Sequence, residues 1–318
     1  MWTLAVALGL TLAVPAALGQ TYPSRPIRAL QGFAVGGNAD AIARVVGTEM
    51  AKALGQPLVV EALAGAGGTK ASAETARAAP DGYTLLLATG GHAVAGALQS
   101  KLPYDTVASF QPVSTITFFP FLVVVRADSP WRSLPDLLAA GRSAADGLAW
   151  GSAGMGTTHH LAGELLAKMA GLKLLHVPYR GDAMSTTAVL GGEVPFIIAP
   201  ATAVEQHVRA GKLRALAVTG AHRWLGMPEV PTVAQQGVPG YDVRSWAGWM
   251  LPAGAPQAVV QRLNDETRRA LLSPEVRERL RQMGGEAQAS SPQEMAALVA
   301  AELRKWTQVA RDAGIPKL

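Results

Sequence analysis

Apolar strand-like segments alternate with helix-like segments along most of the chain, and glycine-rich turns join several of them. Examples are PIRALQGF before GGNADAIAR, YTLLLAT before GGHAVAGAL, and VPFIIA before TAVEQHVRAG. After the first of these turns, apolar residues recur at the i, i+3, i+4 spacing of an amphipathic helix. This alternation is typical of α/β proteins with mostly parallel sheets, in which ligands bind beyond the carboxyl ends of the strands.

Two sets of such segments are separated near FLVVVRADSPWRSLPD, where Ser133 and Asp136 can form a helix capping box. The run VSTITFFPFLVVV just before it is too short to cross a bilayer as a helix and contains Pro120. We interpret this run as two buried strand segments, with the domain boundary close behind them.

The last third of the chain has a different pattern and is predicted to be strongly helical. Pro256, Pro274 and Pro292 fit the first helical position, and Ser273 and Ser291 fit the N-caps of the last two helices. The segment PGYDVRSWAGWMLPAG before them is expected to be a strand that crosses back to the first set.

Composition narrows the class of protein. The chain has 318 residues, of which 49% are hydrophobic and 16% charged, so it is a folded chain with room for two medium domains. Its net charge of +5 comes from scattered Lys and Arg without interleaved aromatics, which gives little support to nucleic-acid binding. The absence of cysteine excludes disulfides, thiol catalysis and a lipoprotein anchor.

Residues 1–19 are predicted to be a signal peptide, with Ala17 and Gly19 at the −3 and −1 positions of a cut before Gln20. The segment departs from the usual pattern because no Lys or Arg precedes its apolar part. A membrane anchor is the alternative, although the apolar stretch is short for a span. We expect cleavage near Gly19 and a periplasmic location.

No catalytic, metal or nucleotide motif is complete. GAGGTK and GMGTTH lack the spacing of nucleotide-binding loops, so their glycines are interpreted as tight turns. Ser152 in WGSAG has Trp150 where a nucleophile elbow needs glycine. The adjacent His159 and His160, like His92, have no metal-ligand spacing. We expect no enzyme activity, no metal and no cofactor.

Polar turns of small residues remain at several strand ends, and their backbone N–H groups and hydroxyls suit a carboxylate. In the glycine turn at residues 36–38, Asn38 is a candidate N-cap of the helix that follows. Asp40 would lie in the first helical turn, where the helix dipole favours a negative charge. The turns are Gly36-Gly37-Asn38, Thr89-Gly90-Gly91-His92, Ser152 to Thr158, and Tyr179-Arg180-Gly181.

From Tyr22 onward the chain resembles the Bug (TctC-like) family, the extracytoplasmic solute receptors of tripartite tricarboxylate transporters. The resemblance rests on ten short motifs in the order of the family. They are YPSRPIR, GGNADAIAR, GAGG, APDGYTLL, LPYDTVASFQPVS, GSAGMGTTHHLAGELL, VPYRG, LGGEV, PTVAQQGVPGY and WAGWMLPAGAP.

The resemblance implies a two-domain, Venus-flytrap (type II-like) periplasmic-binding-protein fold that closes over its ligand and delivers it to a membrane permease. The expected parts are residues 20–125 for the first domain, 126–235 for the second, 236–255 for the return crossover and 256–318 for the C-terminal helices. We also expect a monomer, and the scattered basic residues give no reason to expect nucleic-acid binding.

Family members typically hold a ligand carboxylate through backbone amides and ordered water in two facing loops. Those loops correspond here to Phe33–Asp40 and Ser152–His159. The residues expected to bind ligand are Phe33, Gly36, Gly37, Asn38, Asp40, Thr89, His92, Ser152, Gly156, Thr157, Thr158, His159, Tyr179, Arg180, Gly181 and Trp246.

The chain departs from the family pattern at Gln31–Phe33, at Ala62–Ala64 and at Pro195, so the identity of the ligand stays open. An amino acid, a dicarboxylate, a tricarboxylate and an aromatic acid are all candidates. Two other functions also remain: a ligand-sensing partner of a membrane regulator, and an exported enzyme on the same scaffold.

Overall fold

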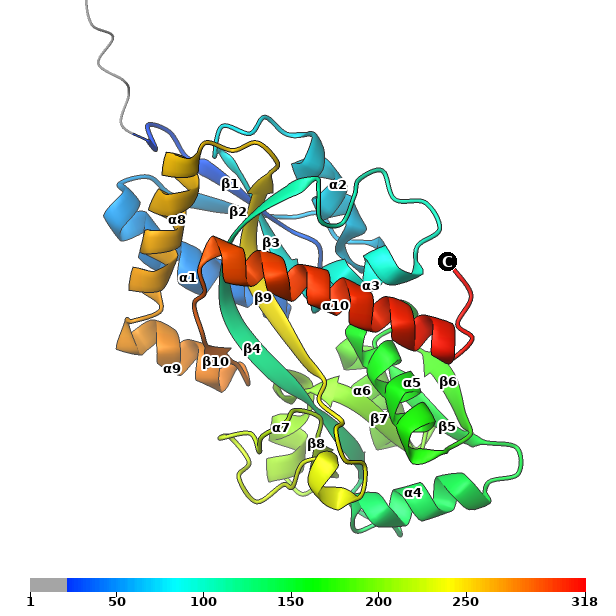
Figure 1. Cartoon of the computed structure of the whole chain (residues 1–318). Coiled ribbons are helices and arrows are strands. Elements are labelled where there is room, and N and C mark those ends of the chain that lie inside the picture. Colours follow the sequence, from blue (N-terminus) through cyan, green and yellow to red (C-terminus); the bar gives the residue numbers. More distant parts are fainter. Residues whose placement is uncertain (1–21) are drawn as a thin grey trace, which may run out of the picture.

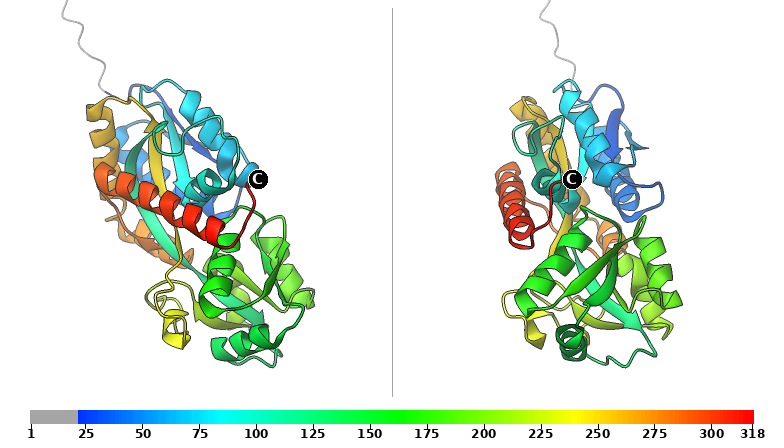
Figure 2. Two further views of the ribbon diagram at one scale, coloured as in Figure 1. Left: turned by 45° about the vertical axis from the view of Figure 1, so that its right-hand side comes forward. Right: turned by 90° about the vertical axis from the view of Figure 1, so that its right-hand side faces the viewer.

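The computed structural model describes residues 22–318, which form two lobes of helices packed on strands (Figure 1). One lobe holds the early strands together with the C-terminal helices, and the other holds the middle of the chain (Figure 2). The predicted signal peptide, residues 1–19, lies outside the described residues. The α/β class expected from the sequence is confirmed.

Strand and helix alternate without exception from β1 to β8. The strands of the described chain are β1 (Ile27–Gln31), β2 (Leu58–Ala62), β3 (Thr84–Thr89), β4 (Phe110–Arg126), β5 (Leu148–Ser152), β6 (Leu174–Pro178), β7 (Phe196–Pro200), β8 (Leu213–Val218), β9 (Arg244–Pro252) and β10 (Glu286–Ala287). The helices are α1 (Asn38–Leu54), α2 (Thr69–Arg77), α3 (Gly90–Leu98), α4 (Leu134–Ser143), α5 (Thr158–Ala170), α6 (Asp182–Gly191), α7 (Ala201–Arg209), α8 (Gln257–Ala270), α9 (Pro274–Gln282) and α10 (Pro292–Asp312), with short 3-10 turns η1 (Ala66–Gly68) and η2 (Ala234–Gln236).

The strands follow the order β2-β1-β3-β9-β4-β7-β5-β6, and β8 and β10 also pair with β4. β1 is parallel to β2 and β3, and β5 is parallel to β6 and β7. β4 and β9 run antiparallel to their neighbours. The sheets are therefore parallel within the βα units and mixed around the two strands that connect the lobes.

β4 is a single strand of 17 residues, whereas the sequence predicted two separate segments. Its residues up to Pro120 pair with β9, and those from Phe121 onward pair with β7 and β8. Pro120 has no N–H to donate, and it stands at the last register position with β9, where the ladder changes partner. The prediction was wrong about the break, because the backbone passes without interruption from one sheet to the other.

The helices bury their apolar faces on these sheets. In α1 the buried residues include Ile42, Val46 and Met50, which share one face of the helix. In α5 a Cβ added at Gly163 would lie 2.1 Å from the indole of Trp150, which is itself 0% exposed. Glycine at position 163 therefore allows α5 to pack directly on β5.

Most of the predicted helix starts are confirmed. Ser133 with Asp136 forms the capping box of α4, and Ser291 with Glu294 forms that of α10. Prolines stand at the first helical position of α9 and α10, as expected. Pro256, predicted at this position, is instead the N-cap of α8, because its backbone is still extended there.

The C-terminal helix α10 packs on α3 of the first lobe and also reaches α5 of the second (Figure 2). Near its end, Asp312 forms an ion pair with Lys168 of α5. After the helix, the backbone N–H of Leu318 donates to the carbonyl of Leu98 in α3. The last helix and the tail therefore connect the two lobes on one side.

Candidate functional site

The turns that follow β1, β3, β5 and β6 come together where the two lobes meet. A Cβ added at Gly90 would lie 3.2 Å from Oγ1 of Thr158 in the other lobe, and one added at Gly67 would lie 4.0 Å from the carbonyl oxygen of Gly156. The turns carry most of the predicted ligand-binding residues: Phe33, Gly36, Gly37, Asn38, Thr89, Ser152, Gly156, Thr157, Thr158, His159, Tyr179, Arg180 and Gly181. Their contact with a ligand stays a prediction.

The turn between β1 and α1 leaves backbone N–H groups without local acceptors. α1 has Gly37 as its N-cap and begins at Asn38, so the prediction of Asn38 as the N-cap was wrong by one residue. No carbonyl of the turn at residues 32–37 accepts a bond from the N–H of Asn38, Ala39 or Asp40. Oδ1 of Asn38 is also buried without a partner among the described residues. The backbone N–H groups of Asn38, Ala39 and Asp40 are thus available as donors to a ligand, and Oδ1 of Asn38 is available as an acceptor.

Asp40 already has partners within the chain. Its carboxylate accepts hydrogen bonds from the N–H of Gly36 at 3.1 Å, from the amide of Gln31 at 3.3 Å and from the Arg44 guanidinium at 2.8 Å. The Arg44 bond, with the Gly36 and Gln31 bonds as smaller causes, lowers the pKa of Asp40 although burial opposes this. Asp40 therefore stabilises the conformation of the turn, and it accepts the N–H of Gly36, which is then not available to a ligand.

The turn between β5 and α5 has a similar arrangement. The Thr157 side chain caps α5 by accepting from the N–H of His160 at 3.2 Å, and its hydroxyl donates to the carbonyl of Gly154 at 2.8 Å. No carbonyl of residues 153–157 accepts from the N–H of Thr158 or His159. Two free donors therefore lie at the positive end of the α5 dipole.

Two stacked histidines, His160 and His176, pack behind this turn, and no pattern in the sequence indicates their pairing. The rings of His160 and His176 lie 4.2 Å apart between centroids. Nδ1 of His160 accepts from the N–H of Gly156 at 3.4 Å, and its Nε2 lies 3.8 Å from Glu164. Burial lowers the pKa of His160 to about 4 and that of His176 to about 3, and it raises the pKa of Glu164. Both imidazoles are therefore neutral at pH 7 and can accept hydrogen bonds.

Ser152 and His176 make a contact that looks catalytic but lacks the other parts of a hydrolase site. Oγ of Ser152 lies 2.6 Å from Nε2 of His176, yet Ser152 is 0% exposed. Nδ1 of His176 is buried without a partner in the described chain, so no carboxylate orients the ring. Residues 22–318 also contain no group of three His, Cys, Asp or Glu side chains that could bind a metal.

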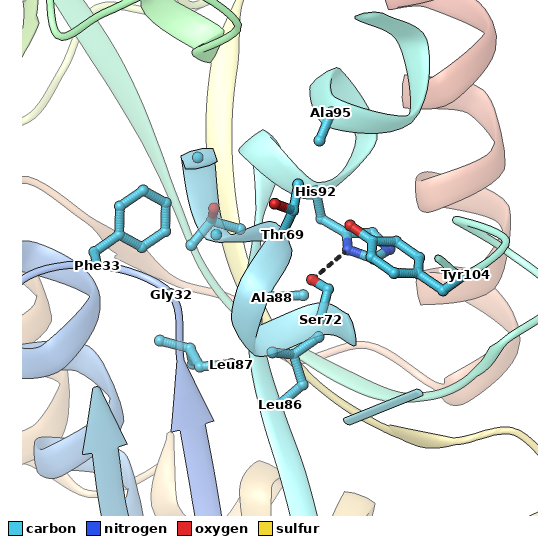
Figure 3. A pocket seen from close by; sticks show the side chains of 13 residues that line it. Gly32, Phe33, Thr69, Ser72, Leu86, Leu87, Ala88, His92, Ala95 and Tyr104 are labelled. Carbon is cyan, nitrogen blue, oxygen red and sulfur yellow. Dashed lines mark hydrogen bonds between the residues drawn. The ribbon is translucent and has the colours of Figure 1, made fainter. Parts of the chain in front are cut away.

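Two predicted ligand residues, His92 and Trp246, lie in packed regions. Trp246 is 1% exposed. Both ring nitrogens of His92 have partners, Nδ1 with Ser72 at 3.1 Å and Nε2 with the carbonyl of Thr106 at 2.9 Å, and the ring stacks on Tyr104. Figure 3 shows the side chains of His92, Ser72 and Tyr104 beside a pocket of about 10 Å³, which is room for about one water molecule. The pocket is too small for an organic anion.

The family model described as "Tripartite tricarboxylate transporter family receptor" (TctC) matches residues 42–315. The chain belongs to this family. A relative from Pseudomonas sp. (strain P51), "UPF0065 protein in tcbD-tcbE intergenic region", is 39% identical to this TctC protein over 289 residues, which cover 91% of this chain and 86% of that protein.

Solved structures agree with this assignment. The periplasmic binding protein BugD is 33% identical with a TM-score of 0.83, and the alignment covers 93% of this TctC protein and 100% of that chain. R. palustris Rpa4515 with adipate is 34% identical with a TM-score of 0.86, with the same coverage of both chains. The expected two-domain periplasmic-binding-protein fold and the Bug (TctC-like) resemblance are thus confirmed.

The TctC assignment makes this protein a solute-binding receptor and not an enzyme. Among residues 22–318, no helix has the length and apolarity needed to cross a membrane.

Proposed function

We propose that this receptor captures a small organic anion through its carboxylate group, between the two lobes, and delivers it to the permease of a tripartite tricarboxylate-type transporter. One observation carries the proposal: α1 in one lobe and α5 in the other both start, at the lobe junction, with N–H groups that no carbonyl of the preceding turn accepts. A carboxylate can accept from such groups and gains from the helix dipole.

The α5 start is the stronger half of this proposed site. At α1 the Asp40 carboxylate already accepts the N–H of Gly36 and is paired with Arg44. At α5 the neighbouring side chains of His160 and His176 are neutral. The turn of residues 152–158 contains no acidic side chain, and the Asp182 carboxylate contacts the imidazole of His159 at the start of α5.

The proposal extends to closure and location. Residues 20–125 and 126–235 would form the two domains, 236–255 the return crossover and 256–318 the helices packed on them, so that bending of β4 and β9 would open and close the site. The receptor would act in the periplasm after cleavage near Gly19. The adipate bound to Rpa4515, a structure of similar fold, supports a carboxylate ligand.

A thermal-shift screen of carboxylates on the mature protein tests the proposal. A ligand at 100 times its dissociation constant adds roughly 2.7 kcal/mol of stability, and an unfolding entropy of about 2.1 cal/mol/K per residue over about 300 residues converts this to a rise in Tm of about 4 °C. The panel contains amino acids, dicarboxylates, tricarboxylates and aromatic acids, and the amide analogue of each hit is the control. A panel without any shift, or equal shifts with the amides, would contradict carboxylate capture.

A further inference from the structure

The side chains of His159 and Asp182 meet at the starts of α5 and α6 and lack hydrogen-bond partners. Nε2 of His159 lies 3.3 Å from Oδ1 of Asp182, and the two atoms do not form a hydrogen bond. Both imidazole nitrogens and Oδ1 of Asp182 are buried without a partner among residues 22–318. Because buried polar atoms are normally paired, these three atoms indicate that a ligand group belongs here.

The pair carries a negative charge at neutral pH. Burial lowers the pKa of His159, and the Asp182 charge raises it by less, so the ring is neutral. The ring packs on Phe121 of β4, with centroids 4.4 Å apart. The Asp182 side chain is 36% exposed. Arg180, the nearest cation in the sequence, is exposed to solvent. A second carboxylate placed against this pair would be repelled.

The position of Asp182 relative to the proposed carboxylate site is fixed by the backbone. The N–H of Tyr179 donates to the carbonyl of Ser152 at 3.0 Å, and that of Gly181 donates to the carbonyl of Ala153 at 3.1 Å. These bonds tie the start of α6 to the turn that leads into α5. His159 contributes both the imidazole that contacts Asp182 and one of the free backbone N–H groups of α5. A group bound by Asp182 therefore lies within the length of the His159 side chain from those N–H groups.

We propose that Asp182, with His159, binds an ammonium group that the ligand carries a few bonds from its carboxylate. The inference rests on the proposed function, because the carboxylate is assigned to the start of α5. A zwitterionic amino carboxylate offers an anion to the helix and a donor to Asp182. The dicarboxylate of the same skeleton without the amino group satisfies the helix but presents only C–H groups to Asp182, and these cannot donate to its carboxylate.

Asp182 also has an ordinary role, because an aspartate in the first turn of a helix interacts favourably with the dipole. That role affects folding and would leave the choice of ligand unchanged. The decisive readout is therefore a ratio of affinities for matched ligands.

Calorimetry on the full mature chain compares succinate with aspartate, glutarate with glutamate, and adipate with 2-aminoadipate. In the wild type we expect the amino compound to bind more tightly within at least one pair. Asp182→Asn should weaken that compound by roughly tenfold or more and leave its dicarboxylate unchanged or tighter. The exposed Asp146→Asn is the matched control and should change neither.

His159→Gln provides a second variant that keeps Asp182 and should weaken the preferred amino compound. Tighter binding of every dicarboxylate by the wild type, or equal weakening of both members of a pair in Asp182→Asn, would overturn the inference and leave carboxylate capture intact. A wild type that binds none of the six compounds or the other carboxylates would overturn both.

Discussion

The free energy of unfolding should fall between pH 7 and pH 5, and replacement of His160 by glutamine should make this fall about 2 kcal/mol smaller. His160 is 3% exposed, stacks on His176 and accepts the N–H of Gly156 through Nδ1. A proton on Nδ1 would remove that acceptor. Protonation would therefore disturb both the folded core and the turn proposed to hold the ligand.

The magnitude follows from the position of the pKa. Burial lowers the pKa of His160 from 6.5 to about 4. As the pH falls below 6.5, the unfolded chain binds the proton first, so the stability contributed by the neutral ring is present above that value and is lost toward pH 4. At pH 5 the pH is about 1.5 units below the pKa of the histidine in the unfolded chain. At about 1.4 kcal/mol per pH unit, protonation of the unfolded chain therefore lowers the free energy of unfolding by about 2 kcal/mol.

Urea unfolding at pH 7 and pH 5 measures this loss for the wild type and for two variants. His160→Gln should show a decrease in unfolding free energy about 2 kcal/mol smaller than the wild-type decrease. His222→Gln, in which an exposed histidine is changed, should match the wild type. Equal decreases in His160→Gln and the wild type would refute the reasoning.

Three further predictions concern the first turn, the packing of α5 and export. Gly37→Val should weaken carboxylate binding by more than tenfold, about 1.4 kcal/mol, whereas Arg28→Ala should change it little. Calorimetry measures both affinities. A loss of affinity in the arginine variant alone would mean that the anion binds elsewhere. Gly163→Ala should destabilise the fold by at least ~1–3 kcal/mol, because its Cβ would overlap the buried indole beneath α5. Gly191→Ala, at a helical glycine with open space around its Cβ, should stabilise it by roughly 0.5–1 kcal/mol, and urea unfolding that ranks the two variants otherwise would contradict this. N-terminal sequencing of the secreted protein should start near Gln20, and retention of Met1 on a cytoplasmic protein would exclude the predicted cleavage.

Local sequence patterns determined the elements of this protein. The alternation of apolar runs with amphipathic helices was sufficient for the α/β class, because each signal lies within one strand or helix. The capping boxes of α4 and α10 were equally readable, since their partners are three residues apart. The gathering of glycine turns within each lobe also followed, because parallel strands bring their carboxyl ends to the same edge of a sheet.

Contacts between distant segments were decided only by the tertiary structure. β4 continues through Pro120 because the sheets on either side offer it different partners, which no local pattern shows. His176 reaches Ser152 because β5 and β6 pair in a register that sets the two side chains beside each other.

The polar partners near the candidate site show the same division. The sequence placed Asp40 in the first turn of a helix, but its bonds to Gln31 and Gly36 depend on how the turn folds back. His159 and Asp182 come from different helices and meet only because the turns before those helices are hydrogen-bonded to each other. Hydrogen bonds and burial act over a few ångströms in space, so partners distant in the chain become visible only when the sheet register and the helix packing are known.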